Sequence, residues 1–160
     1  MGLWVVGRYR FPELYQKLRF VHDAEILLMP SAFAVKTGEA HWETLLRARA
    51  IECQCYVVAS AQVGQHNTDG NKRRSWGHSI VFGPPSIPQH APRRPARPRP
   101  VRPRPVFVKL PGFPLFFVAD PWGEKLVDMG GAAEGLATFS VDADLIRQTR
   151  GSMPLATHRR

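Results

Sequence analysis

Four side chains near the middle of the sequence are of types that take part in catalysis: His41, Glu43, Cys53 and Cys55. An imidazole with a carboxylate can act as a general acid–base pair, and a cysteine thiolate is a nucleophile. His41 and Glu43 stand two positions apart, so on a helix they do not face one another. The cysteines have the same spacing, which is too tight for an ordinary disulfide and supplies only two metal ligands. We therefore predict no metal site at the cysteines, and we interpret both of them as buried and inert.

These residues lie on or beside a helix that we predict to run from Thr37 or Gly38 to about Cys55. Apolar side chains recur along it at helical spacing, with a stripe formed by Trp42, Leu45, Leu46, Arg49, Ala50 and Cys53. The following run, Tyr56–Ala61, is apolar and rich in β-branched residues, which predicts a strand buried on both faces.

Other predicted elements flank this pair. Phe11–Leu14 opens a helix with Pro12 in its first turn, and Asp142 caps a last helix that continues to Arg150. The remaining segments are predicted strands at 24–29, 77–82, 125–127 and 136–141, and a polar loop at 64–75. Alternating helices and strands indicate an α/β fold.

A segment of different character interrupts this pattern. Residues 83–119 contain 11 of the 15 prolines, seven cations and no acid. The whole chain has a net charge of +9, and without this segment it would be nearly neutral. Such a composition predicts a disordered or extended insert that favours polyproline II. The chain is thus divided into 1–82, the insert 83–119, and 120–160. The insert has Pro-x-x-Pro spacings within 98–103 and could recruit an SH3-type partner or an acidic surface. A solvated basic linker is the plainer interpretation, and nucleic-acid binding is not expected without interleaved aromatic residues.

Several short motifs occur in an order that resembles the C-terminal half of nitrilase-superfamily carbon–nitrogen hydrolases. They are Arg10-Phe11-Pro12-Glu13-Leu14, Pro30-Ser31-Ala32-Phe33, the run from Ala40 to Glu52, Trp76-Gly77-His78-Ser79 and Asp120-Pro121-Trp122-Gly123. The resemblance implies part of an α-β-β-α sandwich, a small amide as substrate, no cofactor, and association with a second copy or with a full-length amidase subunit.

The resemblance also implies a catalytic set of a glutamate base, a lysine that stabilises the oxyanion, and a cysteine that forms a thioester. Aligning the shared Arg10–Leu14 motif places that cysteine at Val6, whose isopropyl group cannot attack a carbonyl. The glutamate and lysine belong to an N-terminal half that these 160 residues do not contain. We therefore expect an inactive fragment or splice form of an amidase. The alternative is an interaction module that docks on a full-length amidase or recruits a partner through the insert.

Three residues are candidates for vestigial contacts with a substrate. Ser31 and Phe33 follow the end of a predicted strand, where sites in α/β proteins collect, and the resemblance implies that their loop borders the pocket. It also places Glu43 near the pocket, where the carboxylate could either contact a substrate or make a structural hydrogen bond.

Cysteine content and hydropathy suggest a compartment. Two unpaired cysteines are typical of a reducing environment, and no apolar run reaches the length needed to span a bilayer. We expect a cytoplasmic or mitochondrial protein with no membrane segment.

Overall fold

The computed structural model describes residues 3–5, 10–66, 69–70, 72–83, 123–131 and 138–158. The predicted insert, apart from Gly83, lies outside the described residues, as do Val6 and Trp122. The predictions made for them therefore remain predictions.

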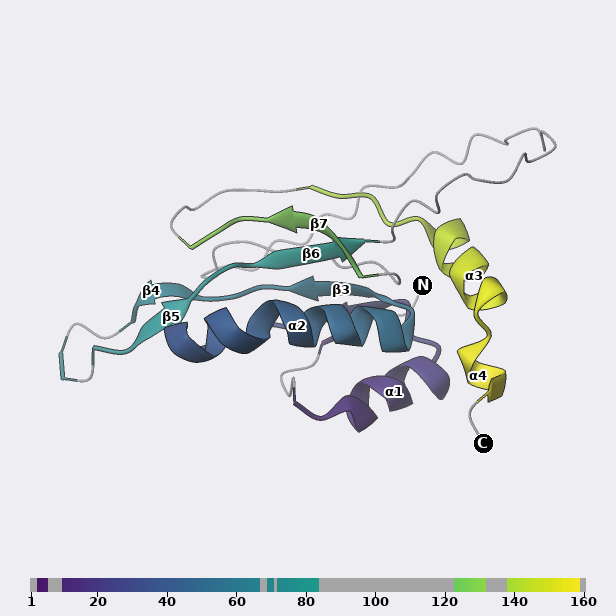
Figure 1. Cartoon of the computed structure of the whole chain (residues 1–160), viewed down its shortest axis with the longest axis horizontal. Helices are drawn as coiled ribbons and strands as arrows, with labels where there is room; N and C mark the ends of the chain where they lie inside the picture. Colours follow the sequence, from purple (N-terminus) through teal and green to yellow (C-terminus); the bar gives the residue numbers. More distant parts are fainter. Residues whose placement is uncertain are drawn as a thin grey trace.

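A five-stranded sheet with the order β1-β2-β3-β6-β7 forms the centre of the fold (Figure 1). β1 (Leu3–Val5), β2 (Ile26–Leu28) and β3 (Tyr56–Ala59) are parallel. β6 (Ile80–Gly83) runs antiparallel to β3, and β7 (Glu124–Asp128) runs antiparallel to β6. All residues of β2 and β3 are buried, as their unbroken apolar sequences predicted.

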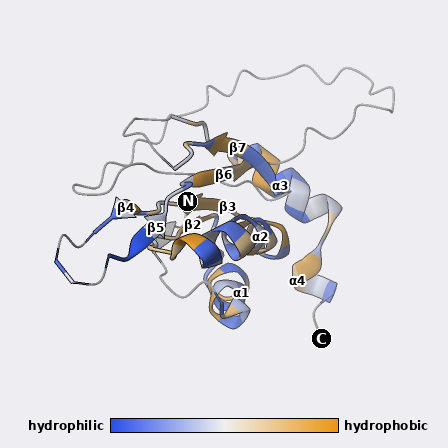
Figure 2. Cartoon of the chain, turned by 60° about the vertical axis from the view of Figure 1, so that its left-hand side comes forward, coloured by the Kyte–Doolittle hydropathy of each residue, from blue (hydrophilic) through white to orange (hydrophobic). Residues whose placement is uncertain are grey.

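Two helices cover one face of this sheet (Figures 1 and 2). α1 (Pro12–Phe20) begins with proline at its first position, and its first-turn Glu13 suits the positive end of the helix dipole, as predicted. α2 (Val35–Cys53) begins two residues earlier than we predicted. It ends at Gln54, which takes a left-handed conformation with φ of 50°.

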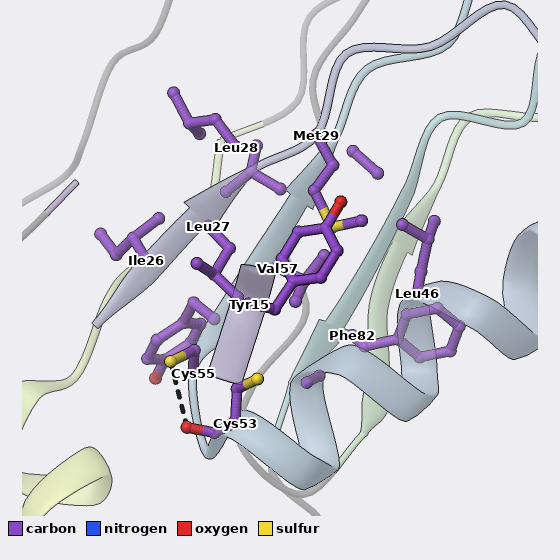
Figure 3. Close-up of a cluster of buried hydrophobic side chains, with 14 of the residues drawn as sticks. Tyr15, Ile26, Leu27, Leu28, Met29, Leu46, Cys53, Cys55, Val57 and Phe82 are labelled. Atoms are coloured by element: carbon purple, nitrogen blue, oxygen red, sulfur yellow. Dashed lines mark hydrogen bonds between the residues drawn. The ribbon is translucent and has the colours of Figure 1, made fainter. Parts of the chain in front are cut away.

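The core lies between these helices and the sheet (Figure 3). Tyr15 of α1 and Leu46 of α2 meet the inward side chains of the strands, including Leu27, Val57 and Phe82, and all five are fully buried. Ile26 and Leu28 extend to the other side of β2 from Leu27, as strand alternation requires, and they are buried too.

The predicted loop at 64–75 was wrong in part. β4 (Val63–Gln65) and β5 (Arg74–Trp76) form a two-stranded antiparallel sheet within it. The sequence of this segment is polar and lacks the alternation of apolar residues by which strands are predicted. A hairpin that is largely exposed to solvent does not require that alternation.

The strand predicted at 77–82 begins only at Ile80. Gly77 and His78 have positive φ angles of 76° and 49°, which interrupt the extended backbone. The sequence analysis did not predict β1 at all, because a three-residue strand is too short to show a pattern. The strand predicted at 136–141 lies partly outside the described residues, and its described part contains only an isolated bridge residue, Ser140.

The C-terminal helix α3 (Ala143–Ser152) is capped as predicted, since the Asp142 carboxylate accepts hydrogen bonds from the backbone N–H groups of Asp144 and Leu145 at 2.8 and 3.1 Å. Arg150 joins this helix to the sheet, donating to the backbone oxygens of Ala24 at 2.6 Å and Gln54 at 3.3 Å. A short helix, α4 (Leu155–His158), follows.

The α/β class is confirmed, while the full sandwich is not. The described residues form one layer of helices packed on one main sheet. An α-β-β-α sandwich has a second sheet with its own helices, and the described residues do not form that second half. None of the described helices combines the length and the apolar character needed to cross a bilayer.

Candidate functional site

The carboxyl ends of β1, β2 and β3 meet at one edge of the sheet, because the three strands are parallel. Ser31 follows β2 there. Its backbone N–H donates to Ser60 at 2.8 Å and its carbonyl accepts from Gln62 at 2.9 Å, so the loop after β2 is fixed to the loop after β3. Ligands of open α/β sheets bind at this kind of edge, and the structure places Ser31 where the sequence predicted.

Phe33 continues this loop and reaches α2. Its ring lies 5.0 Å from that of Trp42 at an interplanar angle of 52°, and its carbonyl accepts from the backbone N–H of Trp76 at 2.9 Å. The Trp42 indole N–H in turn donates to the carbonyl of His78. Phe33 is half-buried, so one part of its ring belongs to the core and another part faces solvent.

Glu43 lies on α2 and faces β7. Its carboxylate accepts hydrogen bonds from Arg47 at 2.7 Å and from Lys125 at 3.0 Å. Burial raises the pKa of Glu43, but the hydrogen bonds from Arg47 and Lys125 outweigh it, and the net pKa is lower than usual. Glu43 is therefore an ionised acceptor with two cationic partners. Phe33 contacts the same helix at Trp42, the residue before Glu43.

Sequence analysis missed the polar cluster around Lys125. Its ammonium donates to Asp128 at 3.2 Å, and the other oxygen of Asp128 lies 3.3 Å from Nδ1 of His78 and accepts the backbone N–H of Gly130 at 3.0 Å. Burial raises the pKa of Asp128, yet the Gly130 and Lys125 hydrogen bonds leave it below its usual value. The hydrogen bond from Lys125 to Glu43 and that to Asp128 raise the lysine pKa against the effect of burial.

Glu43 is 82 positions from Lys125, and His78 is 50 positions from Asp128, so no local spacing could have found these two contacts. His78 itself was predicted to be a packing residue, and its ring does stack on Trp76 with centroids 4.4 Å apart.

His41 belongs to a different surface, as its spacing from Glu43 predicted. Its side chain is exposed and lines a shallow depression of about 330 Å³ together with Arg10, Ala40, Thr44 and Leu45. A guanidinium, an imidazole and a hydroxyl thus surround a small hollow between the start of α1 and the first half of α2.

Cys53 and Cys55 lie at the opposite end of the sheet, where β3 begins. Both are free thiols with no exposed surface. Burial raises the pKa of Cys55 to about 11, and it also raises the pKa of Cys53. The Cys55 sulfur lies 3.1 Å from the carbonyl oxygens of Ala24 and of Cys53, and its one S–H is shared between them. Figure 3 shows the contact with Cys53. Both thiols are therefore closed to solvent, which confirms that they are buried, and burial with a raised pKa supports their interpretation as inert.

The described residues offer no metal site either, because no three histidine, cysteine, aspartate or glutamate side chains among them gather closely enough.

Three comparisons with known proteins indicate the same family. The profile of the carbon–nitrogen hydrolase family matches residues 1–88. Proteins named deaminated glutathione amidase match all 160 residues, at 37% identity in Dictyostelium discoideum and 39% in Homo sapiens, over 41% and 36% of their own lengths. The crystal structure of the Caenorhabditis elegans NitFhit protein superposes on 99% of this chain with a TM-score of 0.64 and 35% identity, over 28% of its own length.

The chain therefore spans about two fifths or less of the length of these relatives. The profile match extends over more than half of the chain and ends just inside the proline-rich insert. It includes the Arg10–Leu14, Ser31–Phe33 and Ala40–Glu52 motifs on which the resemblance rested. The chain belongs to the carbon–nitrogen hydrolase family, within the nitrilase superfamily.

Proposed function

We propose that this chain is a fragment or splice form of a nitrilase-superfamily amidase and that it has no amidase activity of its own. Val6 carries the proposal, because it occupies the position that the family motif assigns to the nucleophilic cysteine. An aliphatic side chain cannot form the thioester through which the family hydrolyses amides. Catalytic groups of this kind act as a unit, so the remaining residues cannot replace the nucleophile.

The topology supports the importance of this position. β1 ends at Val5, so residue 6 follows it directly, just as Met29 follows β2 and Ser60 follows β3 at the same sheet edge. The two cysteines that the chain does contain precede β3, at the other end. No thiol of this chain can therefore serve a substrate placed beside Ser31 and Phe33.

Relatives named deaminated glutathione amidase suggest the substrate class of the intact site, an amide C–N bond in a small molecule. Ser31 and Phe33 would be remaining contacts with such a molecule. For Glu43, the two ion pairs favour the structural alternative, because both carboxylate oxygens already have cationic partners. The carboxylate then holds α2 against β7 instead of holding a ligand.

An interaction module is the second candidate function. The chain matches its relatives from end to end while covering a minor part of their length. It therefore keeps surfaces that would contact the rest of the fold in a complete family member. We propose a full-length amidase subunit, or a second copy of this chain, as the partner. Co-purification of a tagged chain with the full-length enzyme would support this candidate, and recovery of the chain alone would count against it.

An assay of the release of the dipeptide amine from deaminated glutathione tests the first proposal, because hydrolysis of its amide bond frees a keto acid and a dipeptide. We expect no release above the buffer rate from the chain purified from a host that lacks the endogenous amidase. The matched control is a full-length family amidase from the same host, which must release the dipeptide under the same conditions. Turnover by the purified chain at a rate proportional to its concentration would refute the proposal.

A further inference from the structure

The hollow between the start of α1 and the first half of α2 has the size and the lining of a small ligand site. Its volume is about 330 Å³, and it is lined by Arg10 on one side and by Ala40, His41, Thr44 and Leu45 of α2 on the other. Residues three and four positions apart share one face of a helix, so α2 presents His41, Thr44 and Leu45 to the hollow together. The side chains of His41 and Thr44 are exposed, and the hollow therefore opens to solvent.

The arginine of this hollow differs from the other described arginines of the helical layer. Each of the others forms an ion pair with a carboxylate three or four positions away: Arg19 with Asp23 at 2.9 Å, Arg47 with Glu43 at 2.7 Å and Arg49 with Glu52 at 2.6 Å. Arg10 has no ion pair with any residue that the structure describes. No acidic side chain is among the described residues that line its hollow. Within the described part of the chain, the charge of Arg10 is therefore not neutralised.

The lining combines hydrogen-bond donors with apolar carbon. The guanidinium of Arg10 has the planar geometry that donates two parallel hydrogen bonds to a carboxylate. The Thr44 hydroxyl and an imidazole N–H of His41 are further donors. Ala40 and Leu45 contribute only methyl and methylene groups, which suit an aliphatic chain. Ligand sites commonly have this division, in which a few polar groups fix the orientation and apolar atoms cover the rest of the ligand.

We propose that this hollow binds a small organic anion, a carboxylate on a short aliphatic chain, with Arg10 holding the carboxylate and Leu45 contacting the chain. A water molecule occupies about 30 Å³ in the liquid, so the hollow has room for no more than about ten non-hydrogen atoms. Inorganic phosphate is the competing ligand, because it would use the same donors. It has no carbon to place against Leu45, and burial of apolar surface favours the aliphatic carboxylate. This inference does not depend on whether the chain hydrolyses amides.

Titration of the isotope-labelled full chain with butyrate, followed by NMR, tests the proposal. We expect saturable shifts of the backbone amide signals of Thr44 and Leu45, with a Kd on the order of 1 mM. Butanol has a similar aliphatic chain without the charge and should bind at least about tenfold more weakly. Phosphate has the charge without the chain and should bind at least about threefold more weakly.

Two substitutions in the hollow and one outside it show whether these side chains form the site. Arg10→Gln should weaken butyrate binding at least about fivefold, and Thr44→Val, which keeps the shape of the side chain, about twofold. Lys17→Gln is the matched control, because Lys17 is an exposed cation of α1 that does not line the hollow. It should leave the affinity unchanged.

Three results would overturn the proposal. The first is the absence of saturable shifts at butyrate concentrations up to about 20 mM, well above the expected Kd. The second is an equal loss of affinity in Arg10→Gln and Lys17→Gln, which would show attraction to the general positive charge of the chain. The third is binding of phosphate or butanol as tight as that of butyrate, which would show that the hollow does not recognise a carboxylate and an aliphatic chain together.

Discussion

Both ends of the sheet carry charged and polar side chains, but those at one end are partly exposed to solvent and those at the other end are buried. Around the end where the parallel strands finish, Glu43, Lys125, Asp128 and His78 form a chain of partly exposed ion pairs and hydrogen bonds beside Phe33. At the end where β2 and β3 begin, Arg19 is nearly buried and both cysteines are fully buried. There Arg150 binds backbone carbonyls.

This difference shows why residue type alone is a poor guide to activity in this chain. The thiols are at the end that is closed to solvent, and the position that the family motif assigns to the nucleophile is occupied by Val6. Charged groups at the buried end hold the C-terminal helix in place. Those at the open end hold β7 against α2.

The largest effect is expected at the buried end, from Arg150→Met. This substitution removes the donors to Ala24 and Gln54 and leaves their carbonyls without those partners. We expect the free energy of unfolding to fall by about 2–4 kcal/mol in urea denaturation. Arg147→Met on the same helix is the matched control, because Arg147 is an exposed residue paired with Asp144. It should change stability by no more than about 0.5 kcal/mol. Equal losses in the two variants would show that the backbone contacts of Arg150 do not stabilise the buried end more than an exposed ion pair does.

A smaller effect is expected at the open end, from Glu43→Gln. The carboxylate is partly exposed, so the loss of its two cationic partners should lower the free energy of unfolding by about 0.5–1 kcal/mol. Its pKa lies below the usual 4.5 in the folded chain. The stability it contributes is therefore present above pH 4.5 and disappears as the pH falls through the folded-state value. Urea denaturation of both chains from pH 7 down to pH 3 measures this, and the two curves should converge in acid. A difference that grows in acid would contradict the ion-pair account.

The smallest effect is expected for the cysteine thiols, which should not react with a thiol reagent while the chain is folded. Because burial raises the pKa of both cysteines and closes them to solvent, a thiol-specific reagent at pH 8 should not modify them within the time that labels a free cysteine peptide. Both should react once the chain is unfolded in urea. Rapid labelling of Cys53 or Cys55 in the folded wild-type chain would show that the buried end is open.

Much of the fold could be predicted because its signals are local. The spacing of Trp42, Leu46 and Ala50, the unbroken apolar run of β3 and the Asp142 cap each depend on neighbours in the sequence. The β4–β5 hairpin and β1 could not be predicted, because one is solvated and the other is too short to show a period. The Arg150 contacts and the Lys125 cluster join residues far apart in the chain, and only the folded topology brings them together.

For the candidate site, the sequence could supply positions along the chain but not the contacts between them. Ser31 and Phe33 follow a buried strand, and the family motif identified position 6. The partners of Glu43 favour its structural role over contact with a substrate. One of them, Lys125, lies 82 positions away, beyond the insert, where no local spacing rule applies.

Intact-mass spectrometry of the chain after incubation with an amide substrate tests the central claim most directly. A family member that hydrolyses an amide through a cysteine carries the acyl group as a thioester during turnover. The purified chain, quenched in acid over a series of times, should show only its unmodified mass, while a full-length family amidase quenched in the same way should show the acylated species. A time-dependent acyl adduct on this chain, located by peptide mapping to any of its residues, would contradict the account.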